Sequence, residues 1–211
     1  MLVEIGHFAL ILAFAVALVQ TALPLWGVRT GDRRLMAVAD PAALTLLALL
    51  ALAFLALMHA YVVSDFSVAT VYANSHTTKP LLYQISGVWG NHEGSMLLWV
   101  LILALYGAAV ALFGGNLPPR LRAGVLAVQG SIAAAFLVFI VVASNPFTRI
   151  PVQPEGQGLN PILQDPALAF HPPFLYAGYV GFSMAFSFAI AALLEGRGDP
   201  AWARCGRPCT L

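Results

Sequence analysis

The sequence has few charged residues, only two cysteines and no run of basic residues. Aspartate, glutamate, lysine and arginine together make up 9% of the 211 residues, whereas a soluble domain carries roughly 25%. Hydrophobic residues make up 60% of the chain, and the mean hydropathy is +0.85. So few charges could not cover the surface of a soluble protein. The composition therefore predicts an integral membrane protein.

The charge balance and the cysteines exclude further classes. The net charge is +1 at pH 7, so nothing indicates an acidic partner or a nucleic acid. Cys205 and Cys209 both lie close to the C-terminal end. Their spacing matches neither the Cys-x-x-Cys of a thiol redox site nor a disulfide framework. We interpret them as two incidental thiols on a tail.

Five segments are apolar and long enough to cross a bilayer as helices. Crossing the hydrocarbon core takes roughly 20 apolar residues, and a helix satisfies its own backbone groups in lipid. The first segment could instead be a signal peptide, but Glu4 stands where a basic region would be and no clear cleavage site follows. We expect an all-α, polytopic membrane bundle. Its predicted spans are residues 8–25, 42–63, 95–113, 123–142 and 174–194.

The arginines predict how the bundle is oriented. Positively charged connections stay in the cytoplasm. We therefore expect the N-terminus outside, the tail in the cytoplasm, and two long outer loops at residues 64–94 and 144–173. The outer side carries only Lys79 and Arg149. The connections after spans one, three and five carry the other basic residues: Arg29, Arg33, Arg34, Arg120, Arg122, Arg197, Arg204 and Arg207.

The two outer loops are where we expect function. Long loops in compact proteins are usually functional or disordered, and these contain aromatic residues, prolines and glycines rather than low-complexity sequence. A neutral imidazole is a frequent ligand of metals and of haem iron. A single histidine without context more often donates a hydrogen bond or caps a helix. All five histidines are assigned on or near the outer face: His7, His59, His76, His92 and His171.

The first informative segment, WGNHEGSMLLW, begins at Trp89. Ser95 could cap the following helix, and Glu93 suits a helix N-terminus electrostatically. Trp89 and Trp99 are placed for an interfacial belt. A purely structural interpretation explains the tryptophans well, but it explains less well why His92 and Glu93 adjoin at the edge of the hydrocarbon.

The second informative segment, FHPPFLYAGY, contains His171. Pro172 favours an extended backbone at His171, and Pro173 can occupy the first turn of the fifth span. The imidazole would thus stand on a stiff backbone just above the membrane, with Phe174 and Tyr176 as aromatic surface nearby. Such an arrangement suits an axial ligand to a flat, hydrophobic macrocycle.

These two segments resemble a known family. WGNHEGSMLLW and LNPILQDPALAFHPPFLYAGYVGFS resemble the large membrane subunit of the bacterial cytochrome c haem lyase, of the CcmF type. This subunit belongs to a haem-handling family named for a tryptophan-rich periplasmic loop. The resemblance extends over the whole chain. It includes PLWG at residues 24–27, VVSDFSVATVYANS at 62–75 and SNPF at 144–147.

The resemblance implies a role in cytochrome c maturation at the periplasmic face of the bacterial cytoplasmic membrane. It implies a transient b-type haem as cofactor. It implies a haem carrier protein, other maturation subunits and apocytochrome c as partners, and no nucleic acid. Of the family's two haem-binding histidines that flank the tryptophan-rich loop, one matches His171, which is thereby expected to be an axial ligand of the haem iron. Further haem-pocket or structural candidates are Trp89, His92, Glu93, Pro172, Pro173 and Tyr176.

The chain departs from the family in length. Family members are about three times longer, and the tryptophan-rich signature, the second flanking histidine and the membrane histidines follow the part that matches residues 1–211. The resemblance therefore implies the N-terminal part of a haem-lyase membrane domain, as a truncated, interrupted or split copy, and we expect it to be inactive alone. A non-catalytic docking subunit is the alternative. A transporter is less expected, because only His59 places an ionisable group near a span interior.

Overall fold

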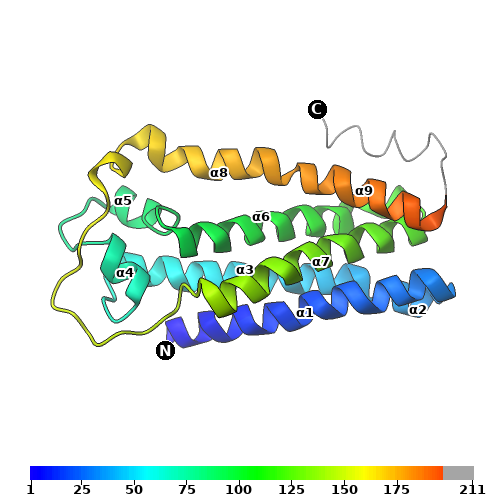
Figure 1. The fold of residues 1–211 in the computed structure, drawn as a ribbon, viewed down its shortest axis with the longest axis horizontal. Helices are drawn as coiled ribbons and strands as arrows, with labels where there is room; N and C mark the ends of the chain where they lie inside the picture. The colour runs from blue at the N-terminus through cyan, green and yellow to red at the C-terminus, as the bar shows by residue number, and fades with distance from the viewer. Residues whose placement is uncertain (197–211) are drawn as a thin grey trace.

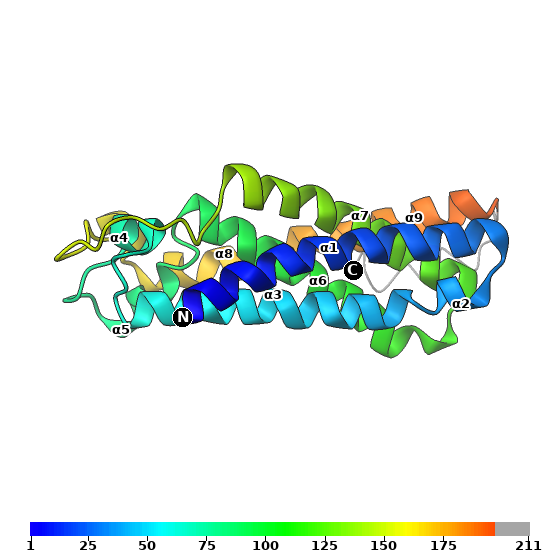
Figure 2. The same cartoon turned by 90° about the horizontal axis from the view of Figure 1, so that it is seen from below.

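The structure, a computed structural model, describes residues 1–196 and shows an elongated all-α bundle (Figure 1). Figure 2 shows the same helices running along the long axis after a 90° turn. Five helical stretches are long and apolar enough to cross a membrane, which confirms the predicted fold class. They are α1 (Leu2–Thr30), α3 (Ala39–Val62), α6 (His92–Phe113), α7 (Pro119–Ala143) and the pair α8 (Pro166–Val180) and α9 (Phe182–Glu195).

The helices extend beyond the apolar segments in the sequence, because a helix can continue into polar surroundings past the hydrocarbon. The helix α1 ends at Gly31, whose φ of 77° is the left-handed conformation that glycine adopts without strain. A short helix, α2 (Arg33–Met36), follows, and the Asp32 side chain caps it by accepting from the backbone N–H of Arg34. The connection between α6 and α7 contains the 3-10 turn η1 (Gly114–Asn116).

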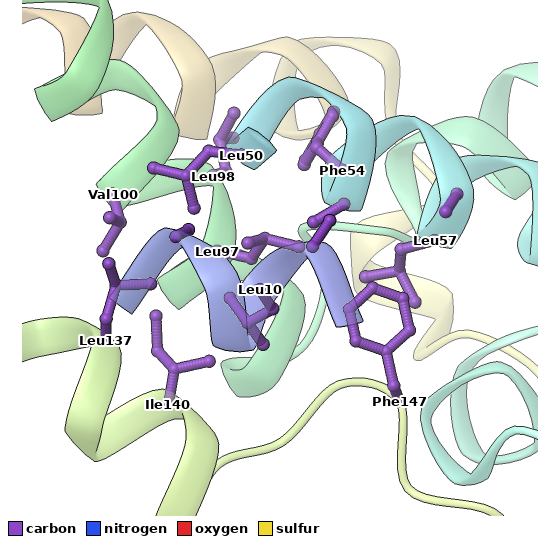
Figure 3. Close-up of a cluster of buried hydrophobic side chains, with 14 of the residues drawn as sticks. Leu10, Leu50, Phe54, Leu57, Leu97, Leu98, Val100, Leu137, Ile140 and Phe147 are labelled. Carbon is purple, nitrogen blue, oxygen red and sulfur yellow. The ribbon is translucent and has the colours of Figure 1, made fainter. Parts of the chain in front are cut away.

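Four helices, α1, α3, α6 and α7, form a tightly packed unit that we call the four-helix core. Leu10, Leu97, Leu137 and Ile140 are completely buried and meet where three of these helices pack together (Figure 3). Small residues bring the helix backbones close. At Gly6 an added Cβ atom would lie 2.7 Å from the Cβ atom of Ala56.

Two buried glutamines add polar contacts between helices that the sequence analysis did not identify. The Gln20 amide donates to the carbonyl of Leu126 at 2.9 Å and so joins α1 to α7. The Gln129 amide donates to the hydroxyls of Ser187 at 2.9 Å and Ser183 at 3.1 Å, which joins α7 to α9. Interhelical hydrogen bonds of this kind hold membrane helices in register.

The predicted outer loops are ordered at one end of the bundle, where the short helices α4 (Ala69–Asn74) and α5 (Leu81–Ser86) lie (Figure 1). The two connections pair with each other, because the backbone N–H of Ala69 donates to the carbonyl of Thr148 at 2.9 Å. Arg149 lies beside them and forms ion pairs with Asp65 and Glu4.

The opposite end carries the basic connections. Arg122 pairs there with Asp40, with 2.5 Å between the guanidinium Nη2 and the carboxylate. Arg29, Arg33 and Arg120 belong to the same end. Arg197, Arg204, Arg207 and both cysteines, Cys205 and Cys209, lie outside the described residues.

The prediction that His171 has an extended backbone and that Pro173 lies in the first turn of the helix is wrong. The helix begins at Pro166, where the Asp165 carboxylate accepts from the backbone N–H of Leu168 at 3.1 Å. His171 therefore lies inside α8 and not on an extended segment, and Pro172 and Pro173 are interior helix residues. The Asp165 cap and an initial Pro166 are strong helix-start signals, and they outweigh the preference that Pro172 imposes on the residue before it.

Candidate functional site

The turn that leads into α6 is held by Asn91. Its Oδ1 atom accepts from the backbone N–H of Gly94 at 2.8 Å, and its Nδ2 atom donates to the Tyr61 hydroxyl at 2.9 Å. The prediction that Ser95 caps this helix is wrong, because the Ser95 hydroxyl donates instead to the carbonyl of Trp89 at 2.6 Å. Asn91 stands at the position where the chain is still extended, which is the geometry of an N-cap.

Gly94 allows this turn to close. An ideal Cβ atom at this position would lie 1.7 Å from the carbonyl oxygen of Val88, so no side chain fits without a shift of the backbone. Glu93 lies beside it in the first turn of α6, where a carboxylate interacts favourably with the helix dipole.

Trp89 joins this turn to α8. Its ring stacks on Phe54 of α3, with centroids 6.4 Å apart and planes 12° apart. Its indole N–H donates to the carbonyl of Ala169 at 2.8 Å. In a regular helix that carbonyl would accept from the N–H of residue 173. Residue 173 is proline, which has no N–H, so Trp89 supplies the missing donor.

A second side chain holds α8 in the same way further along. The Tyr106 hydroxyl of α6 donates to the carbonyl of Ala177 at 2.6 Å. The regular donor to that carbonyl would be Gly181, but α8 ends there and the N–H of Gly181 contacts the carbonyl of Tyr179. The helix α8 is thus attached to α6 and the turn before it through two carbonyl groups that its own backbone leaves free.

A cavity of about 370 Å³ lies between α8 and the turn before α6. It brings together four of the predicted site residues, whereas His171, Glu93 and Pro173 do not line it. Its volume is at the small end of the range for ligand pockets. The lining residues are Ser86, Trp89, Gly90, Asn91, His92, Ser95, Leu159, Leu163, Leu168, Ala169, Pro172 and Tyr176.

Three of the histidines have structural partners. The Nδ1 atom of His92 lies 2.9 Å from the Ser144 hydroxyl, and its ring packs edge-on against Phe139 of α7. His7 and Asn145 are joined by a hydrogen bond of 3.0 Å, and His76 contacts the Thr78 hydroxyl at 2.9 Å. Hydrogen bonds of this kind are expected of histidines that stabilise the fold.

His171 differs from them. Its side chain is exposed, and within residues 1–196 it has no hydrogen-bond partner. One helical turn further on, Phe174 is 76% exposed and Leu175 is 48% exposed. Two turns on is Gly178, where an added Cβ atom would meet nothing within 4 Å. The imidazole therefore stands on an open, apolar face of α8 that suits a flat macrocycle, and haem fits the residues present.

This face of α8 presents one exposed histidine within the described residues. No group of three or more histidine, cysteine, aspartate or glutamate residues that could hold a metal ion occurs among residues 1–196. A site for a metal ion bound only by side chains is therefore not formed within this part of the chain. A single exposed histidine is compatible with an iron atom that its porphyrin already coordinates on four sides.

These features define a class: a multi-pass membrane protein with an ordered end that carries an exposed histidine on an apolar helix face. The chain belongs to the family described as Cytochrome C assembly protein, which matches residues 89–204. This range includes Trp89, all of α6 and the whole of α8. The family acts in cytochrome c maturation and handles haem.

Individual relatives agree with this assignment. The chain is 66% identical to "Cytochrome c-type biogenesis protein ccl1" of Rhodobacter capsulatus, over 100% of this chain and 32% of that protein. It is 51% identical to "Cytochrome c-type biogenesis protein CcmF" of Escherichia coli K12, over 100% of this chain and 33% of that protein. The chain therefore spans about a third of the length of these relatives.

A solved structure has the same fold. The "Cytochrome c Heme Lyase CcmF" superposes with a TM-score of 0.86 at 29% identity, over 100% of this chain and 33% of that chain. The likeness covers the whole of the chain, so it includes both the four-helix core and α8–α9.

Proposed function

We propose that this chain forms the N-terminal part of a cytochrome c haem lyase and that His171 is an axial ligand of the haem. The observation that carries the proposal is the exposed imidazole of His171 on the apolar face of α8. Haem would be held there for covalent attachment to apocytochrome c at the periplasmic face of the membrane.

The residues of this chain would perform three tasks. The imidazole of His171 would supply the nitrogen lone pair that binds iron. Phe174 and Leu175 would cover part of the macrocycle and exclude water from it. The N-terminal turns of α8, capped by Asp165, would fix the height of the imidazole above the bundle. Haem itself would supply the vinyl groups that form thioether bonds with apocytochrome cysteines.

The orientation and the partners are part of the proposal. The end of the bundle opposite to α4 and α5 carries the basic connections, which supports a cytoplasmic location of that end. The histidine-bearing end would then face the periplasm and meet the haem carrier, apocytochrome c and other maturation subunits. The second axial ligand would come from the part of the relatives' length that this chain does not span.

Complementation in two pieces tests the proposal. The host is a bacterial strain that lacks its own full-length subunit. It would express this chain alone, or together with a separate polypeptide that covers the remaining two thirds of the Rhodobacter capsulatus relative. We expect holocytochrome c only with both pieces, and none when the first piece carries His171→Ala. The matched control is His59→Ala, at another exposed histidine of this end.

A docking subunit without chemistry is the second candidate, because α8 and α9 present a broad exposed apolar surface. The two candidates differ in one outcome. Holocytochrome c formed by the His171→Ala chain with the second piece would favour docking and reject the haem-ligand role. Holocytochrome c formed by the chain alone would contradict the prediction that it is inactive alone.

A further inference from the structure

The geometry points to Trp89 as the positioning residue for His171, acting through the carbonyl group of Ala169 that Pro173 leaves without a helical donor. This inference rests on the proposed function for its consequence, but its structural part can be tested without haem. Trp89 lies in the turn before α6, far from His171 in sequence, and it does not belong to the exposed face of α8.

Two consecutive prolines interrupt the regular hydrogen bonds of α8. In an α-helix the N–H of each residue donates to the carbonyl four residues earlier. Pro172 and Pro173 have no N–H, so the carbonyls of Leu168 and Ala169 lose their regular donors. Leu168 is 39% exposed, whereas Ala169 is 3% exposed. A buried carbonyl group requires a partner, and Ala169 is the buried residue of the two.

The indole of Trp89 supplies the donor that Pro173 lacks. The Trp89 indole N–H reaches the Ala169 carbonyl at 2.8 Å. The indole ring is itself fixed by stacking on Phe54 in the four-helix core. The backbone two residues before His171 is therefore attached to a rigid side chain of the core, which sets the height and direction of the imidazole.

The two hydrogen bonds that hold α8 act at different places along the helix. The other bond that holds α8, from the Tyr106 hydroxyl to the Ala177 carbonyl, lies on the far side of His171 and at the junction with α9. Loss of that bond would affect the junction. Loss of the Trp89 bond would affect the turns that carry His171. The two bonds give a matched pair of variants on one helix.

Hydrogen–deuterium exchange of the purified haem-free chain is the first measurement. Trp89→Phe keeps an aromatic ring beside Phe54 but removes the donor, and we expect the amides of residues 167–174 to exchange about tenfold faster. Tyr106→Phe should leave this segment unchanged and affect residues 177–182. Trp99→Phe, whose ring packs on Phe136, should leave residues 167–174 unchanged.

A reciprocal substitution makes the test specific for the hydrogen bond. Pro173→Ala restores an N–H at the position that donates to Ala169 within the helix. In the double variant Trp89→Phe with Pro173→Ala, we expect exchange of residues 167–174 to return to within twofold of the wild-type rate. Fast exchange that Pro173→Ala does not reverse would show that Trp89 acts through packing alone, and would overturn the inference.

Haem binding is the second measurement, with haemin as the probe and the Soret band as the readout. We expect Trp89→Phe to bind haem about tenfold more weakly with an altered midpoint potential, and the double variant to recover both. Unchanged exchange and unchanged haem affinity in Trp89→Phe would overturn the inference. If the exchange results hold but the wild-type chain binds no haem, the positioning of residues 167–174 stands and the proposed function fails.

Discussion

The four-helix core and α8 use their side chains in opposite ways. Leu97 and Leu137 of the core are completely buried, and α7 buries residues along most of its length. Within the described residues, α8 buries only Ala169 and Val180. Its large apolar residues point outward, among them Phe174 at 76% exposure. The core is therefore a scaffold, and α8 is a partly covered helix that presents a histidine.

The comparison shows how a weakly buried helix can still be fixed. Packing contributes little to α8, so its position depends on a few directed contacts. These are the Asp165 cap, the Trp89 bond to Ala169 and the Tyr106 bond to Ala177. Each contact uses a backbone N–H or C=O group that has no partner within α8. The group is free because the helix begins or ends there, or because the residue that would donate to it is a proline. Removing one such contact is expected to move α8 without unfolding the core.

The largest expected difference between the two regions is in the response to truncated leucines. Leu97→Ala removes a buried side chain of α6 and leaves a cavity, so we expect a loss of about 2–5 kcal/mol in the free energy of unfolding. Leu175→Ala, on the exposed face of α8, should change it by less than about 0.5 kcal/mol. Thermal unfolding in detergent micelles measures both. Equal losses would show that α8 is as well packed as the core.

The next largest effect concerns the turn that carries Trp89. Gly94→Ala places a Cβ atom against the carbonyl of Val88, and we expect a loss of about 1–3 kcal/mol from overpacking. Gly107→Ala is the control on the same helix, because an added Cβ atom there meets nothing within 4 Å. That control should be neutral or stabilising, since alanine favours a helix more than glycine does. A tolerated Gly94→Ala would contradict the geometry of this turn.

A smaller effect is expected where α9 joins the core. Gln129→Met keeps the length of the side chain but removes the bonds to Ser183 and Ser187. Such bonds contribute about 0.6 kcal/mol each in membrane proteins, so a loss of about 1 kcal/mol is expected. The control is Ser131→Ala, whose hydroxyl bonds only within its own helix, to the carbonyl of Val128. Chemical unfolding of the pair would compare them directly, and a harmless Gln129→Met would argue that packing alone holds α9.

The smallest effect concerns the connections beside α4 and depends on pH. Partial burial acts to raise the pKa of Asp65, but hydrogen bonds from Ser67 and Arg149 outweigh it and lower the pKa below its ordinary value. A carboxylate with a lowered pKa stabilises the fold above its unfolded pKa of about 4, and this is lost as the pH falls through the folded value.

Arg149→Gln tests this contribution. Because the pair is partly exposed, we expect a loss of about 0.2–1 kcal/mol at pH 7. The loss should be smaller at pH 3, which lies below the unfolded pKa of Asp65, so that part of the contribution is already lost. Arg29→Gln, at the opposite end of the bundle, is the control. Melting temperatures of the three chains at the two pH values give the comparison, and a larger loss at pH 3 would contradict the assigned sign.

The sequence allowed the five apolar helices to be predicted, because each carries an uninterrupted run of residues that only lipid or a core can accept. It did not allow the start of α8 to be predicted. Pro172 and Pro173 looked like a helix entrance, and the donor that makes them tolerable inside a helix, Trp89, is remote in sequence. Contacts of that kind depend on the tertiary fold.

The same limit applies to the candidate site. The sequence drew attention to Trp89, His92 and His171, but not to their different roles. His92 bonds to Ser144, whereas His171 has no hydrogen-bond partner within the described residues, and this difference has no local signal in the chain. Asn91 was missed as the cap of α6, although asparagine is one of the residues preferred at an N-cap.

A haemin titration of the purified chain in nanodiscs tests whether His171 is an axial ligand of the haem. It compares the wild type with His171→Ala and with His59→Ala, and it records the Soret band together with the spin state of the bound haem. We expect saturable binding with a histidine-ligated spectrum for the wild type and for His59→Ala, and loss of both for His171→Ala. An unchanged spectrum and affinity in His171→Ala would show that His171 is not an axial ligand of the haem.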